Sequence, residues 1–145
     1  NEAMSEETAY LMLELMKGVV AYGTGIRLRL KYELENPIAG KTGTTNNHSD
    51  GWFMGLTPDL TTGVWVGQDT FTTIGKGETG ARAALPIWIE FMQKALLGRP
   101  VQYFDIPDDV IKVRIDPWTG LLAPNDAPNA VEALFKKGTE PKSFQ

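Results

Sequence analysis

The sequence predicts an α+β fold, in which an antiparallel sheet meander is flanked by helices. Two stretches with apolar residues at helical spacing, 5–22 and 85–98, predict helices. Between them, three short apolar runs separated by Asn, Asp, Gly and Pro predict strands. Connections this short favour antiparallel neighbours. The length of 145 residues suits one compact domain.

The first predicted helix begins after Ser5, a suitable N-cap that is followed by two glutamates in the first turn. One side of this helix is expected to be buried, and its apolar residues are Ala9, Met12, Leu13, Met16, Val19 and Val20. Gly23 is expected to end the helix, because glycine readily takes a positive φ. Residues 26–36 carry many charges and are compatible with either a strand or an exposed loop.

The three predicted strands are residues 37–45, 52–57 and 63–69, with turns between them. Trp52 and Trp65 fall within these strands and are expected in the core. The turn between the first two strands contains Asp50, expected as a turn or capping carboxylate, and His48, expected as a solvated loop residue. Residues 71–84 are rich in Gly and Thr and predict a loop. Its residues Glu78, Thr79 and Gly80 are expected to form a plain connection, with an approach of this loop to a binding cleft as the alternative.

The second helix is expected to start near Pro86, because proline suits a first helical turn. Its apolar stripe consists of Trp88, Phe91, Met92, Ala95 and Leu96. Glu90 is spaced to pair with Lys94, and Gly98 is expected to end the helix. Five prolines interrupt residues 101–145, where 110–116 predict a strand and 129–137 a short helix. We therefore divide the chain into a domain portion, residues 1–100, and a tail, residues 101–145, that wraps this domain.

Composition excludes several classes of function. The net charge of −4 gives no electrostatic support for nucleic-acid binding. The absence of cysteine excludes disulfides and thiolate metal sites, and a single histidine does not make a metal centre. No run approaches the roughly 18 apolar residues that a membrane-spanning helix needs. We expect neither a metal nor an organic cofactor.

The stretch "GKTGTT", residues 40–45, combines a cation with hydroxyl groups, as an anion site would. A nucleotide-binding phosphate loop would need glycine at the position of Glu35, and Pro37 interrupts the motif, so we reject that reading. A structural strand with an exposed lysine is the simplest alternative. The third reading is the Lys-Thr-Gly element of serine penicillin-recognising enzymes.

The chemistry of that element explains each of its residues. Lys41 supplies a cation for a substrate carboxylate, and Thr42 and Thr44 supply hydroxyl donors to the same group. Gly43 lets the substrate lie close along the strand, so that an acyl-donor peptide can add as a further strand. The backbone N–H of Thr44 can stabilise a developing oxyanion.

Longer segments strengthen this reading. The segment "AGKTGTTNNHSDGWFMGLTPDLTTGVWVGQD" resembles class A penicillin-binding proteins, the bifunctional peptidoglycan synthases. Further similarity lies in "GVVAYGTG", "GETGARAALPIWIEFMQKAL", "IDPWTGLLAP" and "LFKKGTEP". Class A β-lactamases share Lys-Thr-Gly, but "TTNNHSDGWFMG" and the long tail are similar to a synthase. The resemblance implies part of a penicillin-binding-protein/β-lactamase-like transpeptidase fold. It places Lys41, Thr42 and Gly43, followed by Thr44 and Thr45, on the strand lining the transpeptidase cleft.

Two other elements of that family, Ser-x-x-Lys and Ser-x-Asn, are missing from this sequence. Its serines are Ser5, Ser49 and Ser143, and none has lysine three or asparagine two residues later. In the family both elements precede Lys-Thr-Gly, and the first residue here is Asn1. We therefore expect a piece of a longer chain that carries the substrate strand without the nucleophile, so no catalytic residue is assigned.

By this resemblance, the parent protein is a D,D-transpeptidase with an upstream glycosyltransferase domain. It is expected to act outside the cytoplasmic membrane, anchored by an upstream transmembrane segment, and to bind peptidoglycan stem peptides and β-lactams. An alternative is a non-catalytic penicillin-binding-like interaction module. A third reading has a second chain supplying the N-terminal half of the domain, in which case the isolated chain would expose an apolar sheet face.

Overall fold

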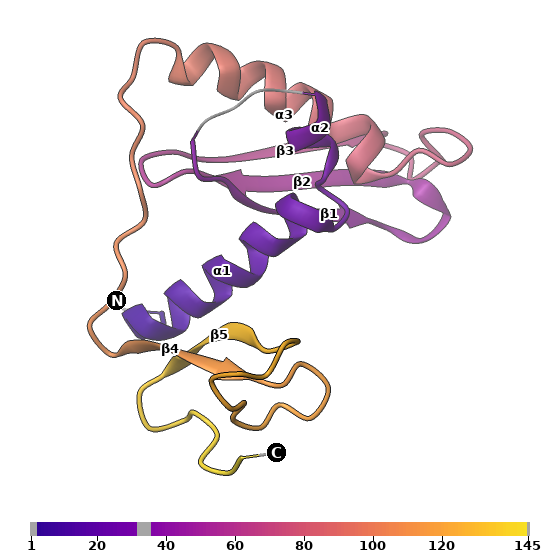
Figure 1. Ribbon diagram of the computed structural model, residues 1–145. Helices are drawn as coiled ribbons and strands as arrows, with labels where there is room; N and C mark the ends of the chain where they lie inside the picture. The colour runs from indigo at the N-terminus through magenta and orange to yellow at the C-terminus, as the bar shows by residue number, and fades with distance from the viewer. Residues whose placement is uncertain (1–2, 32–35, 145) are drawn as a thin grey trace. The chain divides into compact units, whose positions relative to one another are not determined.

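The computed structural model describes residues 3–31 and 36–144 (Figure 1). The chain forms two compact units, of which the larger is Glu14–Phe104 and the smaller combines Asn1–Leu13 with Asp105–Gln145. Helix α1, Glu6–Tyr22, contributes residues to both units. Within the described residues, no helix has the length and apolar character needed to cross a membrane. The expectation that residues 101–145 wrap the domain stays a prediction.

A three-stranded antiparallel sheet forms the centre of the larger unit. Its strands are β1, Ala39–Thr44, β2, Asp50–Leu56, and β3, Thr61–Gly67, in the order β1-β2-β3. The predicted meander is therefore confirmed. A short 3₁₀ turn, Asn46–His48, joins β1 to β2. The register pairs Thr42 with Phe53 and Trp52 with Trp65, so each of these pairs lies on one face of the sheet.

Helix α3, Gly80–Leu96, covers one face of this sheet (Figure 1). Trp88 is fully buried against Phe53, with ring centroids 5.1 Å apart in an edge-to-face arrangement. The indole Nε1 of Trp88 donates to the backbone oxygen of Thr62, at 3.0 Å. The buried residues of the cluster are Val20, Leu28, Ile38, Phe53, Ala84, Leu85, Trp88, Ile89, Met92 and Leu96. This cluster is the hydrophobic core on the α3 side of the sheet.

Three predictions about α3 need correction. The helix begins at Gly80, so residues 80–84 are helical and Pro86 lies inside the helix. Proline removes one backbone hydrogen bond there, which the helix tolerates because Pro86 is on its exposed side. Phe91 is 49% exposed, because the buried face of α3 is formed by Trp88, Ile89 and Met92. The pairing of Glu90 with Lys94, at 2.8 Å, and the end at Gly98, with φ +75°, are confirmed.

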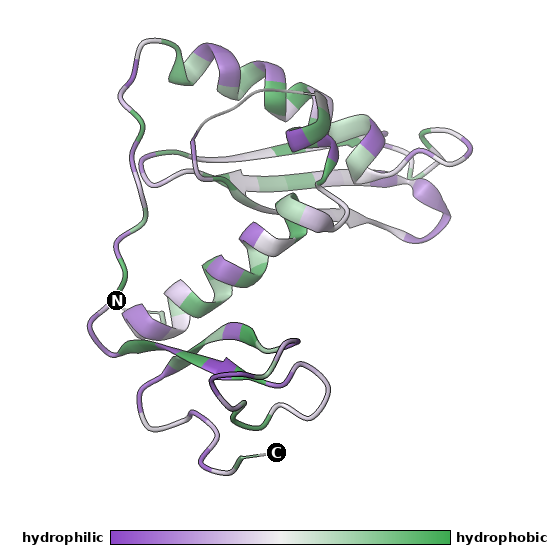
Figure 2. Cartoon of the chain, in the orientation of Figure 1, coloured by the Kyte–Doolittle hydropathy of each residue, from purple (hydrophilic) through white to green (hydrophobic). Residues whose placement is uncertain are grey.

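Helix α1 also departs from its predicted buried stripe. Val20 is buried as expected, but Ala9 and Met12 are exposed, and Tyr10 is buried instead. In Figure 2, purple and green segments alternate along α1, as expected for an amphipathic helix. Gly23 follows the helix without a positive φ. A Cβ there would lie 2.9 Å from the backbone of Val19, so glycine is needed for close approach.

The segment predicted as a strand or an exposed loop, residues 26–36, contains neither where it is described. Residues Arg27–Lys31 form a short helix, α2, and residues 32–35 lie outside the described part of the chain. Leu28 is buried in the core, whereas Leu30 is exposed. The alternation of "IRLRLKY" resembled a strand, but a single buried leucine anchors one helical turn instead.

The prediction that Trp52 and Trp65 belong to the core is wrong. Trp52 is 43% and Trp65 45% exposed, on the sheet face opposite α3, where their ring centroids are 6.3 Å apart. Val64 and Val66 point the other way and pack against the core. Strand alternation separates the tryptophans from the valines but does not say which face is covered. The sheet thus presents an apolar face that includes Met54 as well.

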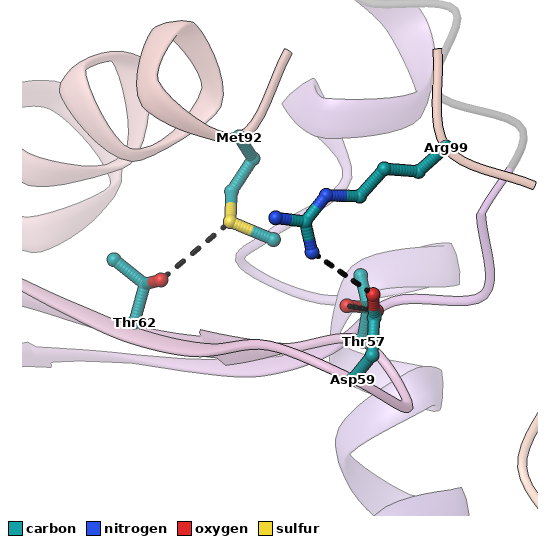
Figure 3. A network of polar contacts seen from close by, with 5 residues as sticks. All are labelled: Thr57, Asp59, Thr62, Met92 and Arg99. Carbon is teal, nitrogen blue, oxygen red and sulfur yellow. Dashed lines mark hydrogen bonds and ion pairs between the residues drawn. The ribbon is translucent and has the colours of Figure 1, made fainter. Parts of the chain in front are cut away.

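The β2–β3 turn is fixed by a small polar network (Figure 3). The buried Thr57 donates its hydroxyl to Asp59, at 2.9 Å, and Arg99 contacts the other oxygen of that carboxylate, at 3.3 Å. The hydrogen bond from Thr57 and the one from Arg99 lower the pKa of Asp59. Since Arg99 follows α3, these contacts hold the end of the helix to the turn.

The smaller unit contains a two-stranded antiparallel sheet of β4, Val110–Ile115, and β5, Val131–Lys136. The strand predicted at 110–116 is confirmed, but the helix predicted at 129–137 is wrong. Isolated helices this short are marginal, and pairing with β4 decides the conformation. The ammonium of Lys136 lies 3.1 Å from Glu7, whose pKa is lowered by a hydrogen bond from Ser5 and by Lys136.

Candidate functional site

The residues of the Lys-Thr-Gly element lie on β1, an edge strand with β2 as its one partner among the described strands. The backbone N–H of Thr45 donates to the backbone oxygen of Asp50, the first residue of β2, at 3.1 Å. Successive N–H groups of a strand point in opposite directions, so the N–H of Gly43 also points toward β2. The N–H and C=O groups of Thr42 and Thr44 therefore point toward the outer edge of the sheet.

The side chains alternate between the two faces. Lys41 lies on the face of Met54, whereas Thr42 and Thr44 lie on the α3 side. The exposed ammonium of Lys41 donates to the backbone oxygen of Thr42, at 2.7 Å. Because that oxygen points toward the outer edge, the ammonium is brought back to the edge. The Lys41 cation and the N–H of Thr44 thus share one open border of the sheet.

Each threonine hydroxyl of this segment has a partner. The hydroxyls of Thr42 and Thr24 are 2.9 Å apart. Thr44 accepts a hydrogen bond from the backbone N–H of Gly80, at 3.1 Å. Thr45 donates to the carboxylate of Asp50, at 3.0 Å, and accepts from the N–H of the same residue, at 2.8 Å. The proton of Thr45 is therefore engaged within the turn, in contrast to that of Thr44.

Asp50 is the turn carboxylate that the sequence predicted. Its second oxygen accepts a hydrogen bond from the indole Nε1 of Trp65, at 2.8 Å. The carboxylate thus links Thr45, directly after β1, to the aromatic pair on the exposed sheet face. This arrangement fixes the position of Trp65 despite its exposure.

The loop after β3 contacts the turn that follows β1. The backbone N–H of Ile74 donates to the oxygen of His48, at 2.8 Å, and Ser49 donates its hydroxyl to the oxygen of Phe71, at 3.2 Å. His48 is half-buried, with Nδ1 buried and unpartnered, so its predicted solvation is wrong. Among the described residues other than glycine, those with positive φ are Asn47, His48 and Phe71, all in these two segments. Such conformations need support from their surroundings.

The sequence favours a plain connection for Gly80 over an approach of its loop to the cleft, and it gives no sign of the contact that Gly80 makes. Its N–H reaches Thr44, a predicted site residue 36 positions earlier. The "GETGA" motif is visible in the sequence, but nothing in its spacing indicates which strand it contacts. In the described part of the chain, no three His, Cys, Asp or Glu side chains are grouped to hold a metal ion.

Two family profiles match this sequence. Residues 1–93 match the profile described as "Penicillin binding protein transpeptidase domain". The chain belongs to this family. Residues 106–144 match a second profile, "Penicillin-binding protein 1A, C-terminal domain". The family recognised from the residues is thereby confirmed.

Comparison with individual proteins supports the same family assignment. Penicillin-binding protein 1A of Pseudomonas aeruginosa is 44% identical over 137 residues, which are 94% of this chain and 16% of that protein. The Aquifex aeolicus protein of the same name is 38% identical over 140 residues, 97% of this chain and 19% of its own length. The crystal structure of penicillin-binding protein 1A from Haemophilus influenzae superposes with a TM-score of 0.88 at 32% identity. It covers 98% of this chain and 22% of that chain, and confirms the predicted α+β, transpeptidase-like fold.

Proposed function

We propose that this chain provides the substrate strand of a peptidoglycan D,D-transpeptidase, and that β1 binds the carboxylate end of the donor stem peptide. The observation that carries the proposal is the outer edge of β1. A lysine cation and the outward N–H of Thr44 lie together there, in a chain of the penicillin-binding transpeptidase family. An extended peptide, or a β-lactam that mimics it, can align along such an edge.

Each site residue has a distinct role in this proposal. Lys41 attracts the substrate carboxylate, and the hydroxyls of Thr42 and Thr44 donate to it. Gly43 leaves room for the substrate backbone. The N–H of Thr44 stabilises the oxyanion that forms on the attacked carbonyl. Thr45 holds the end of the strand through Asp50.

The nucleophile of the reaction comes from outside this sequence. A serine oxygen forms a bond to the carbonyl carbon of the penultimate D-Ala, the peptide C–N bond breaks, and the terminal D-Ala leaves with the proton. An amine of a second stem peptide then displaces the serine and forms the cross-link. We place this activity in the whole protein, anchored at the outer face of the bacterial cytoplasmic membrane.

Acylation of the full-length protein by a fluorescent penicillin tests the site. Lys41→Ala should lower the second-order acylation rate by about 10- to 100-fold, because it removes a charge-assisted hydrogen bond of about 1.5–3 kcal/mol. Lys94→Ala is the matched control, since Lys94 is an exposed lysine on α3 that pairs with Glu90. An unchanged rate in Lys41→Ala would refute the assignment.

A second candidate function is a non-catalytic interaction module. The observation that favours it is the missing Ser-x-x-Lys in this sequence. The same penicillin experiment separates the two, because a full-length protein of this kind would take no label. In a sample that contains the 16.0 kDa chain itself, a labelled larger chain beside an unlabelled 16.0 kDa chain would mean that the site is shared between two chains.

A further inference from the structure

The N-terminus of α3 is capped by a residue of the proposed site. The first N–H groups of a helix lack partners within the helix. Thr79, which precedes α3, makes no capping hydrogen bond with its side chain. The N–H of Gly80, the first helical residue, donates instead to Oγ1 of Thr44 on β1, at 3.1 Å. A substrate-binding hydroxyl is therefore also the acceptor for the start of this helix.

This contact constrains the direction of the Thr44 hydroxyl. A hydroxyl has one proton and can accept through two lone pairs. One lone pair of Thr44 receives the N–H of Gly80, so the proton must point away from the helix. The positive end of the α3 dipole favours the same orientation. The hydroxyl is thus arranged as a donor toward an anion outside α3.

Glycine at position 80 permits this contact through its missing side chain. A Cβ at Gly80 would lie 2.5 Å from the backbone oxygen of Gly43 and would clash with the backbone oxygen of Trp52. Both oxygens belong to the paired strands β1 and β2, so neither can move without disturbing the sheet. The helix can therefore approach Thr44 this closely only with glycine at its first position.

We propose that Gly80 is a positioning residue of the transpeptidase. Its N–H orients the Thr44 hydroxyl so that this hydroxyl donates to the substrate carboxylate. The inference rests on the proposed function, since it deepens the role given to Thr44. Gly80, at the start of α3, thus contributes to substrate recognition through Thr44 and does not itself contact the substrate.

The decisive experiment removes the Gly80 N–H by a backbone amide-to-ester replacement in the full-length protein, which also weakens the Thr79 carbonyl as the acceptor for Arg82 and Ala83. Two probes are compared, benzylpenicillin and its methyl ester, which differ in the carboxylate. The rate of acylation by benzylpenicillin should fall about 3- to 10-fold, the effect of one neutral hydrogen bond, while the rate for the methyl ester changes less than about twofold. The same replacement at Ala81 is the control, since it alters the same helical turn, and it should change neither rate.

Thr44 variants supply an independent test of the coupling. Thr44→Val removes the hydroxyl and should produce the same selective loss, whereas Thr44→Ser keeps the acceptor and should retain the wild-type ratio of the two rates. In Thr44→Val, the ester replacement at Gly80 should cause no further loss, because it acts through the missing hydroxyl. Thr61→Val, which removes an exposed threonine hydroxyl at the start of β3, should leave both rates unchanged.

The outcomes separate this inference from the proposed function. An equal loss for both probes, or additive losses in the Gly80 and Thr44 double variant, would overturn the positioning role while leaving the transpeptidase assignment in place. A wild-type protein that neither probe acylates would overturn the proposed function, and this inference with it. Gly80→Ala is expected to disturb the sheet itself, so the ester replacement carries the test.

Discussion

Trp88 is the side chain whose removal should weaken the sheet–helix core most clearly. It is fully buried, it packs edge-on against Phe53, and its Nε1 donates to Thr62. Trp88→Phe keeps an aromatic ring but deletes the hydrogen bond and part of the ring volume. Trp118→Phe is the matched control, because Trp118 is 87% exposed.

The magnitude follows from three contributions. The lost hydrogen bond costs about 1 kcal/mol. The smaller ring leaves roughly 40 Å³ unfilled, which at about 24 cal/mol per Å³ costs about 1 kcal/mol. The lost burial of apolar surface adds about 1 kcal/mol. We therefore expect Trp88→Phe to lower the free energy of unfolding by about 3 kcal/mol, and Trp118→Phe to change it by less than about 0.5 kcal/mol.

Two measurements on the 145-residue chain check this expectation. Urea denaturation followed by circular dichroism gives the free energy of unfolding without relying on the replaced fluorophore. Tryptophan fluorescence reports the burial of Trp88, because the other three tryptophans, Trp52, Trp65 and Trp118, are all exposed to a large extent. Trp88→Phe should therefore remove the short-wavelength part of the emission. A loss of less than about 1 kcal/mol, or an unshifted spectrum, would refute the packing described for α3.

Three further predictions concern positions away from the outer edge of β1. Gly55→Ala should destabilise the chain by about 1–3 kcal/mol, because its Cβ would lie 2.5 Å from the Trp88 ring; a denaturation midpoint equal to wild type would contradict this. Thr57→Val should cost about 1 kcal/mol in the same assay, since it deletes the hydroxyl that holds the β2–β3 turn. Asp116→Asn tests pH dependence: the backbone N–H of Thr119 is the main cause that lowers the pKa of Asp116. A carboxyl with a lowered folded-state pKa stabilises the fold above its unfolded-state value of about 3.9, and this contribution is lost as pH falls through the folded-state pKa. The stability advantage of wild type over Asp116→Asn should accordingly be present at pH 6 and diminish as the pH falls below about 3.9.

The meander could be read from the sequence because local chemistry determines it. Turn residues flank each strand, and apolar residues alternate with other residues within it. The sequence therefore predicts all three strands, β1, β2 and β3. The Lys-Thr-Gly segment was placed on a strand for the same reason. Its position at the edge of the sheet, with the N–H of Thr44 turned outward, follows from pairing with β2 and could not be read from the segment itself.

The errors share a cause in long-range contacts. Pro86 predicts a helix start, but α3 begins six residues earlier, at Gly80, where the helix contacts β1. The burial of Trp65 depends on which sheet face α3 covers, which alternation does not reveal. The sequence predicts a helix at β5 because six residues show no decisive period, and the partner strand β4 lies about 20 residues earlier.

The alternation of backbone groups along β1 has a consequence for hydrogen exchange. The amides of Lys41 and Gly43 point toward β2 and should be protected from deuterium, whereas those of Thr42 and Thr44 face outward and should exchange quickly. Slowly and rapidly exchanging amides therefore alternate along β1. A molecule that binds along this edge would slow the exchange of the Thr42 and Thr44 amides and leave that of Lys41 and Gly43 unchanged. Hydrogen exchange alone would therefore show both that the molecule is bound and which amides of β1 it covers.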